Sequence, residues 1–106
     1  MTSELDGLQR WYESQCDGDW EHTYGIRIET LDNPGWLVDI PLAETELEGR
    51  PFPTIRNPEP ERDWLFCEVK EAEFRGRGGA GMLSTILRTF LDWAQATPVQ
   101  PDPPAV

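Results

Sequence analysis

The sequence predicts an α+β fold in which an N-terminal and a C-terminal helix pack on one face of a small antiparallel sheet. Apolar residues recur at helical spacing near both ends of the chain, and apolar and polar residues alternate in several segments between them. Turn-forming residues separate these segments, as expected for strands joined by hairpins. Strands grouped between terminal helices are typical of the α+β class, and the expected order is α-β-β-(β)-β-β-α.

The first helix is expected over residues 4–16. Ser3 and Asp6 have the spacing of a capping box at its start. The apolar stripe of this helix consists of Leu5, Leu8, Tyr12 and Cys16. A cysteine on such a stripe is expected to be buried and unreactive, and the same is expected of Cys67 in a later strand.

A β-hairpin should follow the helix. Residues 24–29 alternate between apolar and polar side chains, and residues 36–40 alternate again after a turn-forming sequence at residues 32–35. This pattern places four aliphatic side chains on one face of the hairpin: Ile26, Ile28, Val38 and Ile40.

Residues 41–60 contain five of the ten prolines, so we expect mostly loop or sheet edge there. The apolar Leu47 and Phe52 leave room for one short strand in this segment. Two further strands are expected at residues 64–69 and near residues 73–75.

The last helix is the most regular segment of the sequence. Its apolar residues keep helical spacing throughout: Leu83, Ile86, Leu87, Phe90, Leu91 and Ala94. Thr97 and Pro98 should end this helix. Residues 98–106 contain four prolines and are expected to form a disordered tail, which leaves one domain over residues 1–97.

With both helices on one face, the opposite face of the sheet should carry a second set of side chains: Arg27, Glu29, Leu37, Asp39, Trp64, Phe66 and Glu68. Aromatic residues gathered on a solvent face often mark a contact surface. Alternatively, the loop at residues 41–60 folds over them, and the sequence leaves both arrangements open.

The formal net charge of −11, from 20 acidic and 9 basic residues, limits the classes of partner. It disfavours direct binding to nucleic acids or to anionic membranes and favours basic protein surfaces, although it also serves solubility.

The N-terminus lacks the basic and apolar regions of a signal peptide, and no apolar run reaches about 18 residues, so we expect a cytoplasmic protein.

Residues 17–22, with the sequence DGDWEH, form the densest polar cluster. A calcium loop starting at Asp17 needs glycine at its sixth position, where His22 stands, and glutamate at its twelfth, where Ile28 stands. The single histidine leaves a histidine-based zinc site without a second histidine, and no serine lies in a G-x-S-x-G elbow. We therefore expect no metal, no cofactor and no catalytic residues, with Asp17 and Asp19 making caps and turn hydrogen bonds.

Residues 76–81 spell G-x-G-x-x-G between a strand and a helix, but too few residues follow for a dinucleotide-binding unit. Residues 75–81 also resemble the pyrophosphate loop of GCN5-related acetyltransferases, which holds coenzyme A phosphates at a helix N-terminus. A small acetyltransferase-like or coenzyme A-binding domain is thus an alternative function. The other interpretation of the segment is a flexible turn that leads into the helix.

Several segments together resemble the immunity protein 53 family. They are LQRWY at 8–12, QCDGDWEH at 15–22, YGI at 24–26, TLDNPGW at 30–36, DWLFC at 63–67 and FLDW at 90–93. The resemblance extends over roughly residues 5–95, and the run CDGDWEH is its most specific part. The segment at 75–81 is richer in glycine and arginine than expected for the family, and the tail is extra.

The resemblance implies an α+β immunity protein of a bacterial polymorphic toxin system. Such a protein is not an enzyme: it binds a cognate toxin domain and occludes its active site. The acidic charge of this chain favours a nuclease as the toxin. A generic acidic adaptor domain is the remaining alternative. The oligomeric state is left open.

The residues expected to contact the toxin form two groups. The first consists of Asp17, Asp19, Trp20, Glu21 and His22, and the second of Trp36, Trp64 and Phe66. Acidic side chains accelerate association with a basic cleft, and exposed aromatic side chains supply contact energy. The competing expectation is that tryptophans in so small a domain belong to its core.

Overall fold

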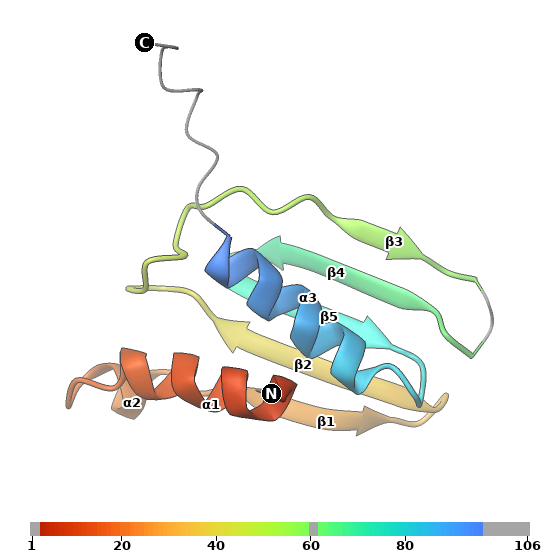
Figure 1. The fold of residues 1–106 in the computed structure, drawn as a ribbon, viewed down its shortest axis with the longest axis horizontal. Helices are drawn as coiled ribbons and strands as arrows, with labels where there is room; N and C mark the ends of the chain where they lie inside the picture. Colours follow the sequence, from red (N-terminus) through yellow and green to blue (C-terminus); the bar gives the residue numbers. More distant parts are fainter. Residues whose placement is uncertain (1–2, 60–61, 97–106) are drawn as a thin grey trace, which may run out of the picture.

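Two helices lie across one face of a five-stranded antiparallel sheet in the computed structural model, which describes residues 3–59 and 62–96 (Figure 1). The elements are α1 (Glu4–Gln15), α2 (Trp20–Thr23), β1 (Arg27–Leu31), β2 (Gly35–Pro41), β3 (Ile55–Asn57), β4 (Leu65–Lys70), β5 (Glu73–Gly78) and α3 (Leu83–Gln95). The strands are ordered β1-β2-β5-β4-β3, so β5 is central. This arrangement confirms the predicted fold class. The expected tail at 98–106 lies outside the described residues.

Helix α1 begins as predicted but buries a different set of side chains. The Ser3 hydroxyl oxygen accepts a hydrogen bond from the Asp6 amide at 3.1 Å. Leu8 and Trp11 are the buried residues of the helix, whereas Cys16 follows its last turn and is exposed. The prediction of a buried Cys16 was therefore wrong, because α1 turns its Leu8 and Trp11 side towards α3 and the sheet. The Leu5 and Tyr12 side of the helix is left exposed.

The β1–β2 hairpin has the predicted pairing of faces, since Ile28 pairs with Val38 and Thr30 with Trp36. Strand β1 starts at Arg27, three residues later than expected, because the one-turn helix α2 occupies residues 20–23. Sequence periodicity did not reveal α2, since a single turn is too short to show a helical repeat.

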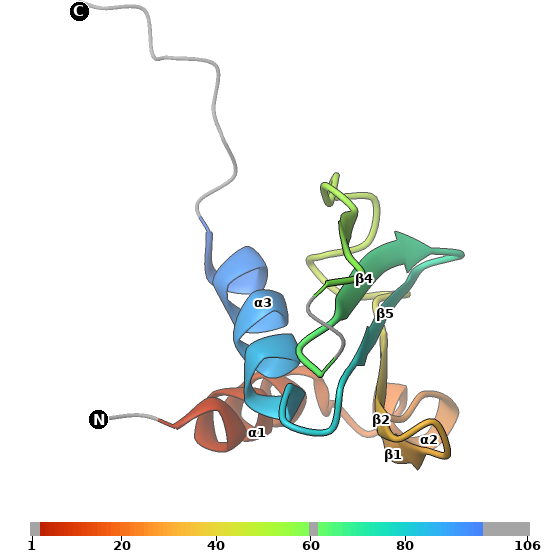
Figure 2. The ribbon, with the colours of Figure 1, turned by 90° about the vertical axis from the view of Figure 1, so that its right-hand side faces the viewer.

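Strand β5 is longer than predicted and includes Gly76 and Gly78. Gly76 pairs with Val38 on one side and Cys67 on the other, so part of the supposed glycine-rich turn is central sheet. A Cβ atom at Gly76 would overlap Ile86 Cγ2 of α3, and one at Gly78 would lie 2.9 Å from Met82 Cβ. The absent side chains thus allow the close approach of α3 to the strand. Figure 2 shows α3 on one side of the sheet.

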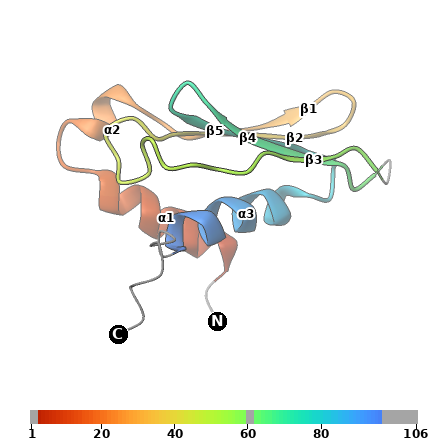
Figure 3. The ribbon, with the colours of Figure 1, turned by 90° about the horizontal axis from the view of Figure 1, so that it is seen from above.

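Residues 42–54 contain no strand, and the short third strand is β3 instead. Leu47 is nevertheless fully buried, and the Phe52 ring packs edge-on against Phe74 and Trp93 at centroid distances of 5.5 and 5.2 Å. Arg50 donates to the Trp93 carbonyl oxygen at the end of α3 at 3.1 Å. This loop therefore lies on the helix side of the sheet and leaves the opposite face uncovered (Figure 3).

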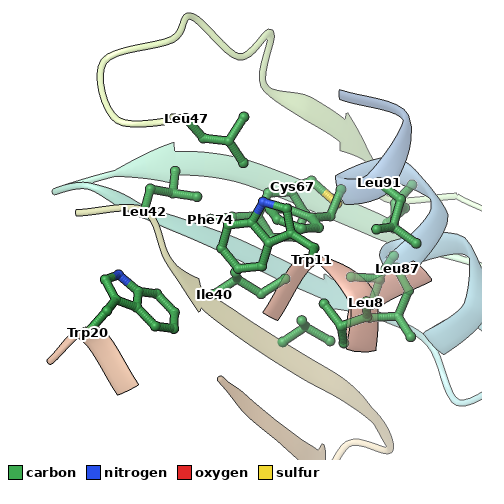
Figure 4. Packing of buried hydrophobic residues seen from close by; sticks show 14 residues of the cluster. Leu8, Trp11, Trp20, Ile40, Leu42, Leu47, Cys67, Phe74, Leu87 and Leu91 are labelled. Atoms are coloured by element: carbon green, nitrogen blue, oxygen red, sulfur yellow. The ribbon is translucent and has the colours of Figure 1, made fainter. Parts of the chain in front are cut away.

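Residues from every layer converge on the sheet to form the core (Figure 4). The Phe90 ring of α3 lies 5.0 Å from the Trp11 ring and 5.2 Å from the Phe74 ring, both in edge-on geometry. It therefore joins both long helices to the central strand. None of the helices in the described part of the chain is long and apolar enough to cross a membrane.

Candidate functional site

The residues expected to bind a partner do not lie together on the fold. Residues 17–22 form the turn and short helix after α1. Phe66 lies on the face of the sheet that faces away from the helices, at the register position opposite Arg77. Trp36, which was grouped with Phe66, belongs to the helix side and donates from its indole nitrogen to the Ala80 carbonyl oxygen at 2.7 Å.

Two carboxylates hold the turn at residues 17–22 together. The Asp17 Oδ1 atom accepts hydrogen bonds from the Asp19 and Trp20 amides at 2.9 and 3.0 Å. The Glu21 carboxylate accepts from the Asp17 amide at 3.0 Å and the Gly18 amide at 2.9 Å. The hydrogen bonds from Trp20 and Asp19 lower the pKa of Asp17, and backbone hydrogen bonds also lower the pKa of Glu21. Both groups are therefore charged at neutral pH and are part of the turn's structure.

Trp20 connects this turn to the core. Its side chain is 4% exposed, and its indole nitrogen donates to the Ala43 carbonyl oxygen at 3.0 Å. Its ring packs against Trp11 and Tyr12 at centroid distances of 6.1 and 6.0 Å. The structure thus places Trp20 inside the molecule, while Asp17, Asp19 and His22 are exposed around it.

A second acidic segment, which the sequence analysis missed, lies against the first. Glu46 accepts a hydrogen bond from the Trp11 indole nitrogen at 3.2 Å, and Glu44 accepts one from the Tyr24 hydroxyl at 2.9 Å. We call residues 11–26 and 42–49 together the acidic end. They hold seven carboxylates and no lysine or arginine: Glu13, Asp17, Asp19, Glu21, Glu44, Glu46 and Glu48.

An open groove of about 550 Å³ borders the acidic end. It lies between α1, α2 and the chain that enters β1, and its lining includes Leu5, Tyr12, Glu21, Tyr24 and Ile26. Among the described residues the three exposed large apolar side chains are Leu5 at 62%, Tyr12 at 36% and Ile28 at 37%. Leu5 and Tyr12 line the groove, and Ile28 of β1 lies two residues after Ile26, the lining residue that directly precedes the strand. We call this surface the apolar groove.

The open face of the sheet, opposite the helices, has balanced charges. Arg77 lies between Leu37 and Phe66 across the strands and forms an ion pair with the nearly buried Asp39 at 2.8 Å. Arg56 lies over the Phe66 ring, 5.4 Å from its centroid. Because Arg27, Arg75 and Arg77 each pair with a carboxylate, this face lacks the strong single-sign charge of the acidic end.

Trp64, which was predicted to lie beside Phe66, is near one end of the sheet. Trp64 precedes β4, and a Cβ atom at Gly35 would lie 3.2 Å from its indole ring. The Trp64 carbonyl oxygen accepts a hydrogen bond from the Gly79 amide at 3.1 Å. Trp64 therefore covers glycines at the strand ends and is half-buried there.

Comparison of the chain with models of protein families shows to which family it belongs. The model of the family described as immunity protein 53 matches residues 5–95. The chain belongs to this family. No curated protein and no solved structure is significantly similar to it.

The immunity protein 53 match includes the acidic end, the apolar groove and the open face in one continuous region. Immunity families imply neutralisation of a toxin and are generally inhibitors without enzymatic activity. Within residues 3–59 and 62–96, no three histidine, cysteine, aspartate or glutamate side chains are grouped so that they could hold a metal ion.

The glycine-rich segment of this immunity protein has a structural explanation. Gly76 and Gly78 make room for α3, and a Cβ atom at Gly79 would collide with the Arg62 carbonyl oxygen. The Gly79 amide already donates to Trp64, so it is not directed at a phosphate. No contact in the described residues favours the coenzyme A alternative over this packing role.

The two cysteines should differ sharply in reactivity. Cys16 is exposed, whereas Cys67 is fully buried, and burial raises the pKa of its thiol to about 11. At pH 8 we expect a maleimide to modify Cys16 in the native protein and Cys67 only after unfolding in urea, because the thiolate is the reactive form. Mass spectrometry of labelled peptides measures this. In a Cys16→Ser control the native protein should take up no label, and rapid labelling of that control would show that Cys67 is accessible.

Proposed function

We propose that this member of the immunity protein 53 family binds a cognate toxin domain in the cytoplasm and occludes its active site. The family match over residues 5–95 carries the proposal, because immunity families neutralise toxins. The acidic end and the apolar groove form the contact surface.

Charge and exposure support this choice of surface. The acidic end gathers seven carboxylates without a lysine or arginine, and Arg10 and Arg50 lie just outside its two segments. Such a field accelerates encounter with a basic surface, while the adjoining exposed Leu5, Tyr12 and Ile28 offer apolar contact area. A toxin with a basic catalytic cleft matches this chemistry. Nucleases carry such clefts because they bind a polyanion, and a nuclease toxin is therefore the class we propose.

The direct test is rescue from toxicity. The toxin domain encoded beside this gene is expressed in a host with and without the immunity protein, and growth is compared. A pull-down from source-cell lysate with this chain immobilised, analysed by mass spectrometry, identifies the partner independently. Growth rescue together with one stoichiometric toxin partner supports the proposal, whereas toxicity that persists at full expression of the folded chain contradicts it.

Charge reversal at the acidic end should weaken toxin binding without unfolding the protein. Glu13 and Asp19 are exposed, and within the described residues their carboxylates accept no hydrogen bond that holds the fold. Asp17 and Glu21 are unsuitable because their carboxylates cap the turn. Changing Glu13 and Asp19 together to lysine should slow association about tenfold, with a smaller effect at high salt because ions screen exposed charges.

The matched control changes Glu59 and Asp63 to lysine, which alters the net charge equally on the connection between β3 and β4. Association rates are measured by surface plasmon resonance at about 0.05 and 0.5 M salt. These concentrations lie below and above the value of about 0.1 M at which the electrostatic screening length is about 10 Å. Equal slowing in both double variants would show that only net charge matters and that the acidic end is not the contact surface.

A further inference from the structure

The two edge strands of the sheet differ in how strongly they discourage pairing with a further strand. Strand β3 forms one edge, has three residues and lies between Pro53 and Pro58. Strand β1 forms the other edge, has five residues and contains no proline. Within the described residues β1 pairs only with β2, so its outer edge presents backbone groups without a strand partner. Natural proteins commonly shorten an edge strand or interrupt it with proline, and β1 shows neither of these two features.

The apolar groove lies along this same edge. Ile28 faces the helix side, where its pair partner Val38 is fully buried, yet it is 37% exposed itself. Leu5 and Tyr12 of α1 are exposed on the other side of the groove. The exposed large apolar side chains of the described chain therefore gather next to the longer, proline-free edge of the sheet.

We propose that an extended segment of the toxin pairs with β1 as a sixth strand, inserts alternate apolar side chains into the apolar groove, and places lysine or arginine against the acidic end. This inference rests on the proposed function and specifies how the partner is held. Backbone pairing supplies affinity in strand addition, and pockets for alternate side chains supply specificity.

Charge favours a basic toxin segment over a second copy of this chain as the occupant. In an antiparallel pair of two β1 strands, the register would bring Asp32 of one copy towards the acidic end of the other. Each copy also carries a formal net charge of −11, and like charges in proximity destabilise association. A basic segment instead neutralises the acidic end while its apolar side chains cover Leu5, Tyr12 and Ile28.

Hydrogen–deuterium exchange of the full chain, alone and with the toxin domain encoded beside its gene, tests strand addition. The outward-facing amides of residues 27–31 should exchange about tenfold more slowly in the complex, because only a new strand occupies them. Exchange in β3 should not change. Binding of the wild-type chain without protection at 27–31 overturns strand addition and leaves the proposed function intact, whereas absence of wild-type binding overturns both.

A pair of substitutions in one cross-strand row tests the groove. Ile28 and Ile55 stand in opposite edge strands and are joined through Val38, Gly76 and Cys67. Ile28→Lys should weaken toxin binding about tenfold or more, while Ile55→Lys should leave it unchanged, with folding of each variant confirmed by urea unfolding. Equal affinities of the Ile28→Lys variant and the wild type overturn the inference. A toxin-free dimer with protected 27–31 amides, detected by light scattering and exchange, also overturns it by assigning the edge to a second copy.

Discussion

Replacement of Trp20 by alanine is expected to lower the free energy of unfolding by about 3–5 kcal/mol, the usual range for truncating a buried tryptophan. The Trp20 ring is 4% exposed and packs against Trp11, Tyr12 and Tyr24. Its indole nitrogen also ties α2 to the Ala43 carbonyl oxygen. The substitution therefore removes one of the contacts that hold the two segments of the acidic end together, beside the hydrogen bonds to Glu44 and Glu46. Urea denaturation followed by circular dichroism measures the loss.

A conservative variant separates packing from hydrogen bonding at this position. Trp20→Phe keeps an aromatic ring but leaves the Ala43 carbonyl oxygen without its donor, which should cost about 1–3 kcal/mol. Trp20→Ala should in addition weaken toxin binding, since the carboxylates of the two segments would no longer be held in one surface. A loss of toxin binding with unchanged stability would indicate instead that the Trp20 ring contacts the toxin directly.

A methyl group at Gly76 should destabilise the fold by about 1–3 kcal/mol, the common range for overpacking a core. The added Cβ atom would overlap Ile86 Cγ2 and lie 3.2 Å from Phe74 Cε2. Ile86 is a fully buried residue of α3 whose Cγ2 methyl group points at Gly76. Gly81→Ala is the matched control from the same glycine-rich segment, because a Cβ atom there meets nothing within 4 Å.

A double-mutant cycle tests whether this clash is the cause. Ile86→Ala alone should destabilise the protein by about 2–5 kcal/mol through the cavity it leaves. Gly76→Ala combined with Ile86→Ala should cost less than the sum of the single changes, since the added methyl group occupies part of that cavity. If the destabilisation of the double variant equals the sum of the two single changes, the methyl group at position 76 does not clash with Ile86 of α3. Titration of the wild type with coenzyme A by calorimetry then distinguishes a phosphate-binding role from a packing role.

Local patterns carried most of the fold prediction. The spacing of Ser3 and Asp6 predicted the start of α1, and helical periodicity predicted the buried face of α3, including Phe90. Alternation predicted that Ile28 and Val38 share a face. Each of these features depends on residues close together in the chain or on the period of a single element, which is why the sequence alone suffices.

The candidate site was predicted only in part. The sequence indicated residues 17–22 and their acidic character, but it did not show that Trp20 is buried. It also did not show that residues 42–49 join them, because that contact depends on hydrogen bonds such as the one from Tyr24 to Glu44, across 20 residues. The apolar groove was missed for the same reason, since α1, α2 and the segment that enters β1 together line it.

The fold class, the order of the two long helices and the strands, and the family could all be predicted from the sequence, because periodicity, turn chemistry and contiguous motifs are properties of short segments. The folded arrangement was needed to show that Cys16 is exposed, that Gly76 lies in a central strand, and that the proline-containing loop leaves the open face uncovered. These features depend on which side of each element faces its neighbours. That choice follows from packing among residues far apart in the chain, as when Ile86 of α3 comes to rest on Gly76 of β5.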